Sequence, residues 1–332
     1  MKATQGTTYR MLGTRLNDVA LDLEKLRTTG ATGKKLSNPS DDPAAIRPVL
    51  NTRKQLSNID RYLETMGKTG DIMAATDGHL EHVENIMQRA KEIMVNAVNG
   101  SLSDEDRTVL ADELVQLKQE MLDAANGNVD GKYIFSGYQE DSKPFTINTS
   151  YTAAGYDAND HTTWPVLYAG DENATFVEIS SGEQLQANLT GNELFLGSTN
   201  WNPPPYNPPD PTGNAVNGID AGRFDLFAEI TQAEEAIRAN DQAAMQTSLQ
   251  DLDGAAEQNR RLRSQLGNRA KRVETAMIHQ EEAQIDLKQV LSRYEDADAI
   301  EVFNDIVQQE TAFQAALSIT SKVSQLSILD FI

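Results

Sequence analysis

The chain has 332 residues, with 29 Lys and Arg against 50 Asp and Glu, a formal net charge of −21 and no cysteine. The absence of cysteine excludes disulfides, thiolate nucleophiles and cysteine metal sites, and the acidic balance excludes nucleic-acid binding through the overall electrostatic field. The sequence has no apolar run near the roughly 20 residues of a membrane span and no apolar region of a cleavable signal peptide, so we expect any export to use another route.

The N-terminal segment, which is mildly basic over residues 1–60, is predicted to form an amphipathic helix. Apolar residues recur there at steps of three and four as far as Leu26, with charged residues between them, and the pattern stops at Thr29-Gly30 and Gly33. We expect this stripe to contact other subunits through Leu12, Leu16, Val19, Leu23 and Leu26.

A polar turn at 37–43 separates this helix from a second one. Asp42 is placed to cap the second helix and Pro43 to occupy its first turn. Pro48 predicts a kink or a later start. The apolar pattern then continues to Asn99-Gly100.

Ser103 and Asp106 predict a capping box for a third helix. The apolar residues of that helix end near Asn126-Gly127.

The middle of the chain has a different composition. Residues 140–222 carry eleven Asp and Glu against one Lys, both Trp residues of the chain lie there, and six of the eleven prolines fall at 203–211. Short β-branched runs bounded by Gly, Asn and Asp predict a small, acidic, solvent-facing β-rich domain over 141–219. We expect the prolines to form a stiff connector.

The C-terminal flank has the strongest periodicity. From Met245 to Tyr294 the apolar positions keep steps of four and three, and a helix of that length would extend about 75 Å. Because no compact domain is that wide, we expect it to run along a rod. Asn259, Arg263 and Gln280 interrupt the seam, and polar seam positions tend to fix register.

A last apolar pattern begins at Ile300. We expect it to form a C-terminal assembly helix with Phe303, Ile306, Phe313, Leu317 and Leu326 as inter-subunit contacts. The fold class predicted is α+β, a long helical coiled-coil rod made by both flanks with an inserted β-rich domain. The domains expected are an N-terminal assembly helix and turn at 1–55, the two rod halves at 56–140 and 220–295, the β-rich domain at 141–219 and the C-terminal assembly helix at 296–332.

Motifs for catalysis and metal binding are weak in this sequence. His79 and His82 could share one helix face, but no third ligand lies nearby in the sequence, so a solvated face is the simpler interpretation. The acidic pairs, such as Asp171-Glu172, lie in polar runs that would not separate their pKa values. The sequence contains no nucleophile elbow, phosphate-binding loop or zinc-protease motif. We therefore expect no catalytic residues, no metal and no cofactor.

Three other patterns have simpler interpretations. The basic residues between Arg260 and Arg272 suggest a DNA-binding zipper, but they lie inside the heptad run, which favours interhelical ion pairs. The tract ending at Tyr206 matches a WW-domain ligand, although a linker is the commoner role. Asn173 and Asn188 fit the glycosylation pattern, which matters only in a eukaryotic secretory setting.

Several stretches in order resemble the flagellar hook-associated protein 3 family, the hook–filament junction proteins, which are relatives of flagellin. The resemblance lies in the two flanks and more loosely in the middle domain. It is carried by Leu26-Arg-Thr-Thr-Gly30, Thr32-Gly-Lys-Lys-Leu-Ser-Asn-Pro-Ser-Asp-Asp-Pro43, Asn99-Gly-Ser-Leu-Ser-Asp-Glu-Asp-Arg107, Asp130-Gly-Lys-Tyr-Ile-Phe-Ser-Gly-Tyr138 with Lys143-Pro-Phe145, Tyr168-Ala-Gly-Asp171 and Tyr294-Glu-Asp-Ala-Asp298.

The resemblance implies a structural adaptor between hook and filament, exported unfolded through the flagellar type III pathway to the outside of a bacterium. The implied partners are copies of the chain itself in a ring, the first hook-associated protein, flagellin and an export chaperone, with no nucleic acid and no membrane. A flagellin-type filament subunit is the alternative within the same class. A heptad-bearing nucleic-acid-binding protein and an enzyme housed in 141–219 are the alternatives from other classes.

Overall fold

The computed structural model describes residues 2–36, 38, 40–100, 102–201 and 218–329; within them it describes side chains at Thr7 and from residue 10 to 322. The chain forms two compact units. The terminal unit comprises Met1–Asp60 with Glu281–Ile332, and the central unit comprises Arg61–Gln280. Helices α2 (Pro43–Asn99) and α6 (Gln242–Glu295) contribute to both units.

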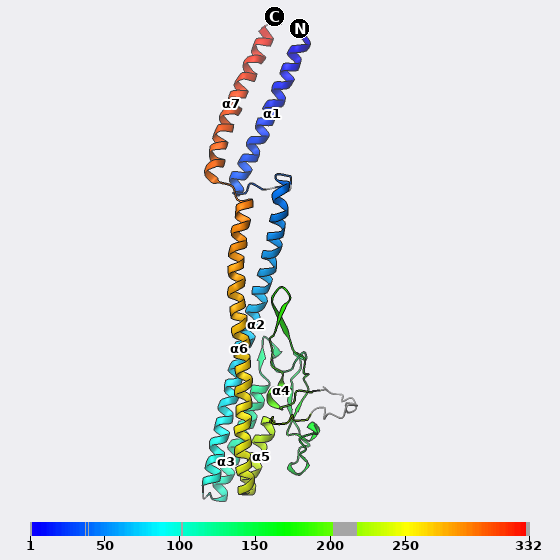
Figure 1. The fold of residues 1–332 in the computed structure, drawn as a ribbon, viewed down its shortest axis with the longest axis vertical. Helices are drawn as coiled ribbons and strands as arrows, with labels where there is room; N and C mark the ends of the chain where they lie inside the picture. The colour runs from blue at the N-terminus through cyan, green and yellow to red at the C-terminus, as the bar shows by residue number, and fades with distance from the viewer. Residues whose placement is uncertain (1, 37, 39, 101, 202–217, 330–332) are drawn as a thin grey trace. The chain divides into compact units, whose positions relative to one another are not determined.

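The terminal unit contains helices α1 (Lys2–Thr32) and α7 (Ala299–Leu329), which lie side by side and run antiparallel (Figure 1). Helix α1 continues to Thr32 and ends at Gly33, whose φ of 68° is a left-handed conformation that glycine adopts without strain. Helix α7 starts four residues after α6 ends, at Ala299.

Helix α2 begins where its cap was expected. The Asp42 Oδ1 accepts hydrogen bonds from the backbone N–H of Ala44 at 2.9 Å and of Ala45 at 3.2 Å. The later start expected from Pro48 was wrong, because α2 runs unbroken from Pro43 with Pro48 inside it. A proline in the second turn removes one backbone donor, and the rest of a 57-residue helix compensates for that loss.

The central unit packs parts of α2 and α6 with α3 (Asp104–Ala125) and α5 (Leu226–Ala239). The capping box that opens α3 is confirmed: the Asp106 N–H donates to Ser103 Oγ at 3.1 Å and the Ser103 N–H donates to Asp106 Oδ2 at 3.2 Å. Helix α2 ends at Asn99 and α3 at Ala125, also as expected.

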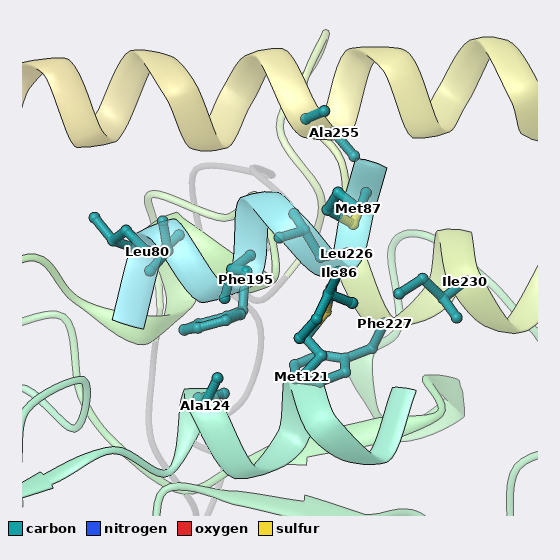
Figure 2. Close-up of a cluster of buried hydrophobic side chains, with 14 of the residues drawn as sticks. Leu80, Ile86, Met87, Met121, Ala124, Phe195, Leu226, Phe227, Ile230 and Ala255 are labelled. Atoms are coloured by element: carbon teal, nitrogen blue, oxygen red, sulfur yellow. The ribbon is translucent and has the colours of Figure 1, made fainter. Parts of the chain in front are cut away.

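The core of the central unit is drawn from all of its helices. Figure 2 shows side chains from α2, α3, α5 and α6 meeting in one cluster. Met87 of α2, Met121 of α3 and Phe227 of α5 are each 0% exposed. Large apolar side chains at helical spacing on several helices thus build one dry interior.

The region inserted between α3 and α5 contains small antiparallel sheets, each of two strands. This arrangement of long helices around a small sheet region confirms the α+β fold class. The elements are β1 (Asn128–Val129) with β2 (Lys132–Tyr133), β3 (Phe145–Ile147) with β4 (Val166–Tyr168), β5 (Phe176–Ser180) with β6 (Glu183–Gln186), the 3₁₀ turns η1 (Ala153–Gly155) and η2 (His161–Thr163), and α4 (Gly191–Phe195).

The inserted region shares its apolar core with the helices. The ring of Phe145 in β3 lies 4.8 Å from Tyr168, 5.2 Å from Phe195 and 5.7 Å from Phe227 of α5, measured between centroids. Phe145, Tyr168 and Phe195 belong to the same buried cluster as the methionines of α2. The β-rich region therefore depends on the helices for burial.

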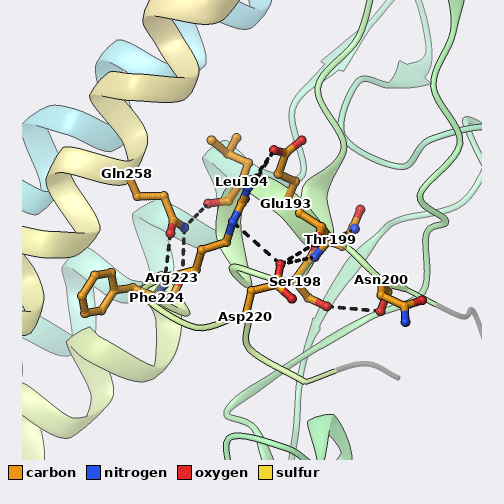
Figure 3. Close-up of polar contacts among 10 residues, drawn as sticks. Glu193, Leu194, Ser198, Thr199, Asn200, Asp220, Arg223, Phe224 and Gln258 are labelled. Atoms are coloured by element: carbon orange, nitrogen blue, oxygen red, sulfur yellow. Dashed lines mark hydrogen bonds and ion pairs between the residues drawn. The ribbon is translucent and has the colours of Figure 1, made fainter. Parts of the chain in front are cut away.

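Polar contacts also attach the inserted region to α6. Gln258 donates from Nε2 to the carbonyls of Leu194 at 3.2 Å and Phe224 at 2.9 Å, and its Oε1 accepts from the Phe224 N–H at 3.0 Å (Figure 3). Beside it, Arg223 pairs with Glu193 at 3.3 Å. One buried amide thus satisfies three backbone groups at the junction between loop and helix.

Two sequence-based interpretations of titratable residues were wrong in part. His79 is half-buried against Phe135, with ring centroids 6.2 Å apart, and its desolvation lowers the pKa of the imidazole, while His82 is exposed. The acidic pairs were expected in polar surroundings, but Asp171 is buried, and two acids outside those pairs, Asp225 and Glu229, are buried at the start of α5. The proline–tyrosine tract at 203–206 lies outside the described residues.

Candidate assembly interface

The apolar stripe of α1 faces α7. Leu23 is buried, and the other stripe residues, Leu12, Leu16, Val19 and Leu26, are half-buried. Met11 and Leu21, which lie off the stripe, are 56% and 51% exposed. Since α1 packs against α7, this difference shows that the predicted stripe is the contact face.

The matching face of α7 contains Val302, Ile306 and Phe313. Val302 is buried and the other two are half-buried. Gly30 allows a close approach at this point, because a Cβ there would lie 3.2 Å from Ile306 Cδ1 and 3.4 Å from Val302 Cγ1. An ion pair between Arg27 and Glu310, at 2.6 Å, flanks the apolar contact.

The residues predicted on α7 divide between two faces. Ile306 and Phe313 lie in the contact with α1, whereas Phe303 and Leu317 are 66% and 44% exposed. The side chain of Leu326 lies outside the described residues. Val302 was not among the predicted residues. The contact face of α7 continues through the half-buried Gln309, Ala316 and Thr320 and so lacks a continuous apolar signal in the sequence.

A second apolar face of α7 is exposed in the isolated chain. Ile300, Phe303 and Val307 recur at i, i+3 and i+7, which places them on one side of the helix, and they are 76%, 66% and 47% exposed. Leu317 follows Phe303 after fourteen residues, or two heptads, and extends the same side. Exposed apolar residues clustered in this way indicate a surface that another protein covers.

The turns at the base of the α1–α7 pair are joined to each other. Lys34 forms an antiparallel β-bridge with Asp296, the Lys35 N–H donates to the Glu295 carbonyl at 2.7 Å, and the Ala297 N–H donates to the Gly33 carbonyl at 2.9 Å. The two helices are therefore anchored by backbone hydrogen bonds where the chain enters and leaves them.

Glu295 is the charged centre of this base. Its side chain is 2% exposed and pairs with Arg53 at 2.6 Å and with Lys34 at 3.1 Å, both of which are about half exposed. A buried carboxylate with two cations is satisfied on both oxygens.

Between the end of α1 and the start of α7 lies an open hollow of about 370 Å³ bordered by Gly30, Val302 and Phe303.

Arg263 is the most extensively paired basic residue of α6. Arg263 donates to Asp77 at 2.8 Å, to Glu81 at 3.0 Å and to Glu84 at 3.4 Å, all on α2, and the pairing raises the pKa of its guanidinium. The adjacent seam residue Asn259 is 0% exposed and donates to the Leu80 carbonyl at 3.1 Å. The predicted interhelical pairing is confirmed for Arg263.

The described residues offer no metal site, since no group of three or more His, Asp or Glu side chains converges there. Nor does any helix in the described ranges combine the length and low polarity needed to span a bilayer.

Comparison with known proteins identifies the family. The model of the bacterial flagellin N-terminal helical region matches residues 7–140, and the model of the bacterial flagellin C-terminal helical region matches residues 249–332. The chain belongs to the flagellin family. The matched ranges contain the α1 stripe and α7 together with α2, α3 and most of α6.

Within this family, the similarity to hook-associated protein 3 extends along the chain. Flagellar hook-associated protein 3 of Salmonella typhimurium is 26% identical over 92% of this chain and 91% of its own length, and that of Escherichia coli is 27% identical over 90% and 89%. In contrast, polar flagellin F of Vibrio parahaemolyticus matches 27% of this chain at 30% identity. The resemblance to hook-associated protein 3 is confirmed.

A solved structure shows the same fold. A flagellar hook-associated protein from Vibrio parahaemolyticus superposes with a TM-score of 0.60 at 18% identity, covering 77% of this chain and all of that one. About three quarters of this chain therefore shares its fold with a solved structure.

Proposed function

We propose that the chain is a structural adaptor subunit that joins the flagellar hook to the filament. The observation that carries this proposal is the similarity to hook-associated protein 3 along about nine-tenths of both chains. The role is mechanical, and no residue is assigned to a reaction.

The proposed setting is the extracellular axial structure of a bacterial flagellum, reached through the flagellar type III pathway. Copies of the chain form a ring, with the first hook-associated protein on the hook side and flagellin on the filament side. An export chaperone is the proposed partner before secretion.

The terminal helices use one face for the contact between α1 and α7 and another face for contacts with neighbouring subunits. Leu12, Leu16, Val19, Leu23 and Leu26 hold α1 against Ile306 and Phe313 and so present a formed pair. Phe303 and Leu317, which this pairing leaves exposed, contact neighbouring subunits, as does Leu326. Burial of such a face on assembly supplies the free energy that an isolated two-helix pair lacks.

Substitution of the exposed face tests the proposal in a strain that lacks the gene. Phe303→Ser combined with Leu317→Ser should give a folded, exported protein that fails to restore filaments. Ile319→Ser is the matched control, because Ile319 is 53% exposed on α7 but lies on another side of the helix. Electron microscopy and swimming assays read the outcome. Filaments that form normally with the double variant would contradict the proposed interface.

Removal of residues 1–30 or 300–332 is the coarser test. Each truncated chain should remain soluble, keep the central unit folded and fail to join a filament. A truncated chain that still assembles would contradict the role of the terminal helices.

The flagellin alternative predicts a different deletion phenotype. Loss of a junction protein should leave hooks in place and release flagellin monomers into the medium, whereas loss of the filament subunit should leave no flagellin to release. The short matches of a flagellin such as polar flagellin F make this the weaker candidate.

The nucleic-acid alternative requires basic residues that are free to bind phosphate. Arg263 is engaged by three carboxylates, and Arg260 pairs with Glu257 at 2.9 Å. We expect no tight, salt-sensitive DNA binding in a mobility assay. Binding that disappears when Arg260, Arg261 and Arg263 become Ala would favour the alternative. An enzyme housed in 141–219 would instead show turnover in a hydrolase screen, which we expect to be negative.

A further inference from the structure

Helix α5 begins with two acidic side chains in the apolar interior of the central unit. Asp225 is 0% exposed and Glu229 is 8% exposed. They are one turn apart, and the Glu229 N–H donates to the Asp225 carbonyl at 3.0 Å. Between them lie Leu226 and Phe227, both 0% exposed, so the local environment is apolar.

Each carboxyl group has one oxygen without a hydrogen bond in the described part of the chain. Asp225 caps α5: its Oδ1 accepts from the N–H of Phe227 at 2.9 Å and of Ala228 at 3.2 Å. The Asp225 Oδ2 and the Glu229 Oε2 are closed to solvent and have no partner among the described residues. A negative charge on these carboxyl groups loses hydration at the unpaired oxygens, and the two N–H donors to Asp225 Oδ1 compensate for only part of that loss, so protonation removes a penalty.

The neighbouring elements supply further acids rather than counter-ions. Asp251 of α6 and Asp225 itself disfavour a charge on Glu229, and Tyr156 of the preceding loop lies within the field of both acids. The nearby cations are engaged elsewhere: Lys118 of α3 pairs with Glu234 at 3.4 Å and Arg223 pairs with Glu193 at 3.3 Å. The other titratable groups facing this site are Tyr151, Asp157 and Glu235.

The loop at 149–157 contacts α5 through a polar contact and lies at the edge of the apolar core. The Tyr151 hydroxyl and the Glu235 carboxyl of α5 share a hydrogen bond of 3.1 Å, and Tyr156 packs at the edge of the core. We propose that Asp225 and Glu229 are protonated in the folded protein at mildly acidic pH and that their ionisation at higher pH loosens this loop from α5.

The raised pKa values of Asp225 and Glu229 determine how the stability of the folded protein changes with pH. Burial raises the pKa of Asp225 from 3.8 to about 7 and that of Glu229 from 4.5 to about 8. Since the unfolded chain has ordinary values, the folded state holds more protons between about pH 4 and pH 8. The extra protons bound by Asp225 and Glu229 stabilise the folded state fully below about pH 4. This stabilisation is lost as the pH rises through 7 and 8. The unfolding equilibrium constant therefore rises by up to about tenfold per pH unit for each acid.

Urea unfolding of the full chain between pH 5 and pH 9 tests the proposal. The midpoint should fall with rising pH in the natural protein and fall less steeply in Asp225→Asn and in Glu229→Gln. Asn keeps the capping oxygen at 225. Asp241→Asn is the matched control: Asp241 caps α6 through hydrogen bonds of 3.0 and 3.1 Å to the N–H of Ala243 and Ala244, but it is exposed. Its variant should keep the natural slope.

A urea midpoint of the natural protein that does not fall between pH 6 and pH 8 would overturn the assignment. A pH dependence of the midpoint that is as steep in both Asp225→Asn and Glu229→Gln as in the natural protein would overturn it as well. If a variant does not fold, infrared spectroscopy of the natural protein in D₂O decides: carboxylic-acid carbonyl bands should be present at pH 6 and disappear towards pH 9. Their absence at pH 6 would overturn the proposal.

Tryptophan fluorescence tests the loosening of the loop. The Trp164 indole donates to the Asp157 carbonyl at 2.8 Å, so its emission reports on this loop. We expect an emission change across pH 7–8 that Asp225→Asn reduces. Emission that stays constant while the urea midpoint falls would overturn the loosening but not the protonation.

Discussion

The helices of the central unit and the α1–α7 pair of the terminal unit bury their apolar residues to different depths. In the central unit, residues of α2 at seven-residue spacing, Met66, Met73, Leu80, Met87 and Met94, are each at most 1% exposed. In the α1 stripe of the terminal unit, Leu23 reaches 6% and the other members are half-buried. A helix covered from several sides is stable within its own chain, whereas a pair of helices covers each member on one side. The shallower burial of the α1–α7 pair supports the proposal that neighbouring subunits cover the terminal helices in the assembly.

Deletion of a buried side chain in the central unit should have the largest effect. Met87→Ala removes a side chain that is 0% exposed and leaves a cavity, so we expect a loss of about 2–5 kcal/mol in the free energy of unfolding. Urea denaturation measures it. Met11→Ala, at a position that is 56% exposed, should change the same quantity by less than about 0.5 kcal/mol. Equal losses in the free energy of unfolding in Met87→Ala and Met11→Ala would contradict the difference in burial between the two helices.

The corresponding change in the terminal unit should act locally. Leu23→Ala removes the most buried residue of the α1 stripe and should lower the opening free energy of the α1–α7 pair by about 2 kcal/mol. Hydrogen exchange followed by mass spectrometry should show faster exchange in α1 and α7 with unchanged protection in α3 and α5. Faster exchange throughout the chain would mean that the units do not unfold separately.

The ion pairs of Glu295, where the chain enters and leaves the α1–α7 pair, should contribute less to local stability. Glu295→Gln removes the charge that Arg53 and Lys34 share, and because both cations are about half exposed we expect a loss of about 1–2 kcal/mol in local stability. The loss should shrink at high salt. Glu301→Gln, at an exposed position of α7, serves as the control in the same exchange experiment. Equal losses of local stability in Glu295→Gln and Glu301→Gln would contradict a special role for the ion pairs of Glu295.

The smallest expected effect is at a helix cap. Ser103→Ala removes the hydroxyl that accepts from the Asp106 N–H, and we expect it to cost about 1 kcal/mol in global stability. Ser103→Thr keeps a capping oxygen and should recover most of that loss. Thermal denaturation of both variants provides the comparison, and an Ala variant as stable as the natural protein would show that the box is dispensable.

Much of the secondary structure could be predicted because its signals are local. The Asp42 cap, the Ser103–Asp106 box and the long helix around Met245–Tyr294 depend on residues within one or two turns of each other, and the structure contains all of them. Pro48 was misjudged for the complementary reason, since the remainder of a long helix offsets one missing donor.

The assembly face could be predicted only in part. The periodicity of α1 indicated its contact face, but α7 has apolar residues on two sides, and periodicity alone did not separate Ile306 from Phe303. Val302 became recognisable only from the position of Gly30 on the facing helix.

The amino-acid sequence by itself determined the helices, their caps, the composition of the acidic middle region and the ordered motifs that indicate the flagellin family, because each depends on neighbours along the chain. Tertiary structure decided which face of α7 meets α1, how the β-rich region shares the core of the helices, and that Asp225 and Glu229 are buried. Burial depends on segments that are distant in sequence: the acids lie at the start of α5, but α3, α6 and the loop carrying Tyr156 determine their surroundings.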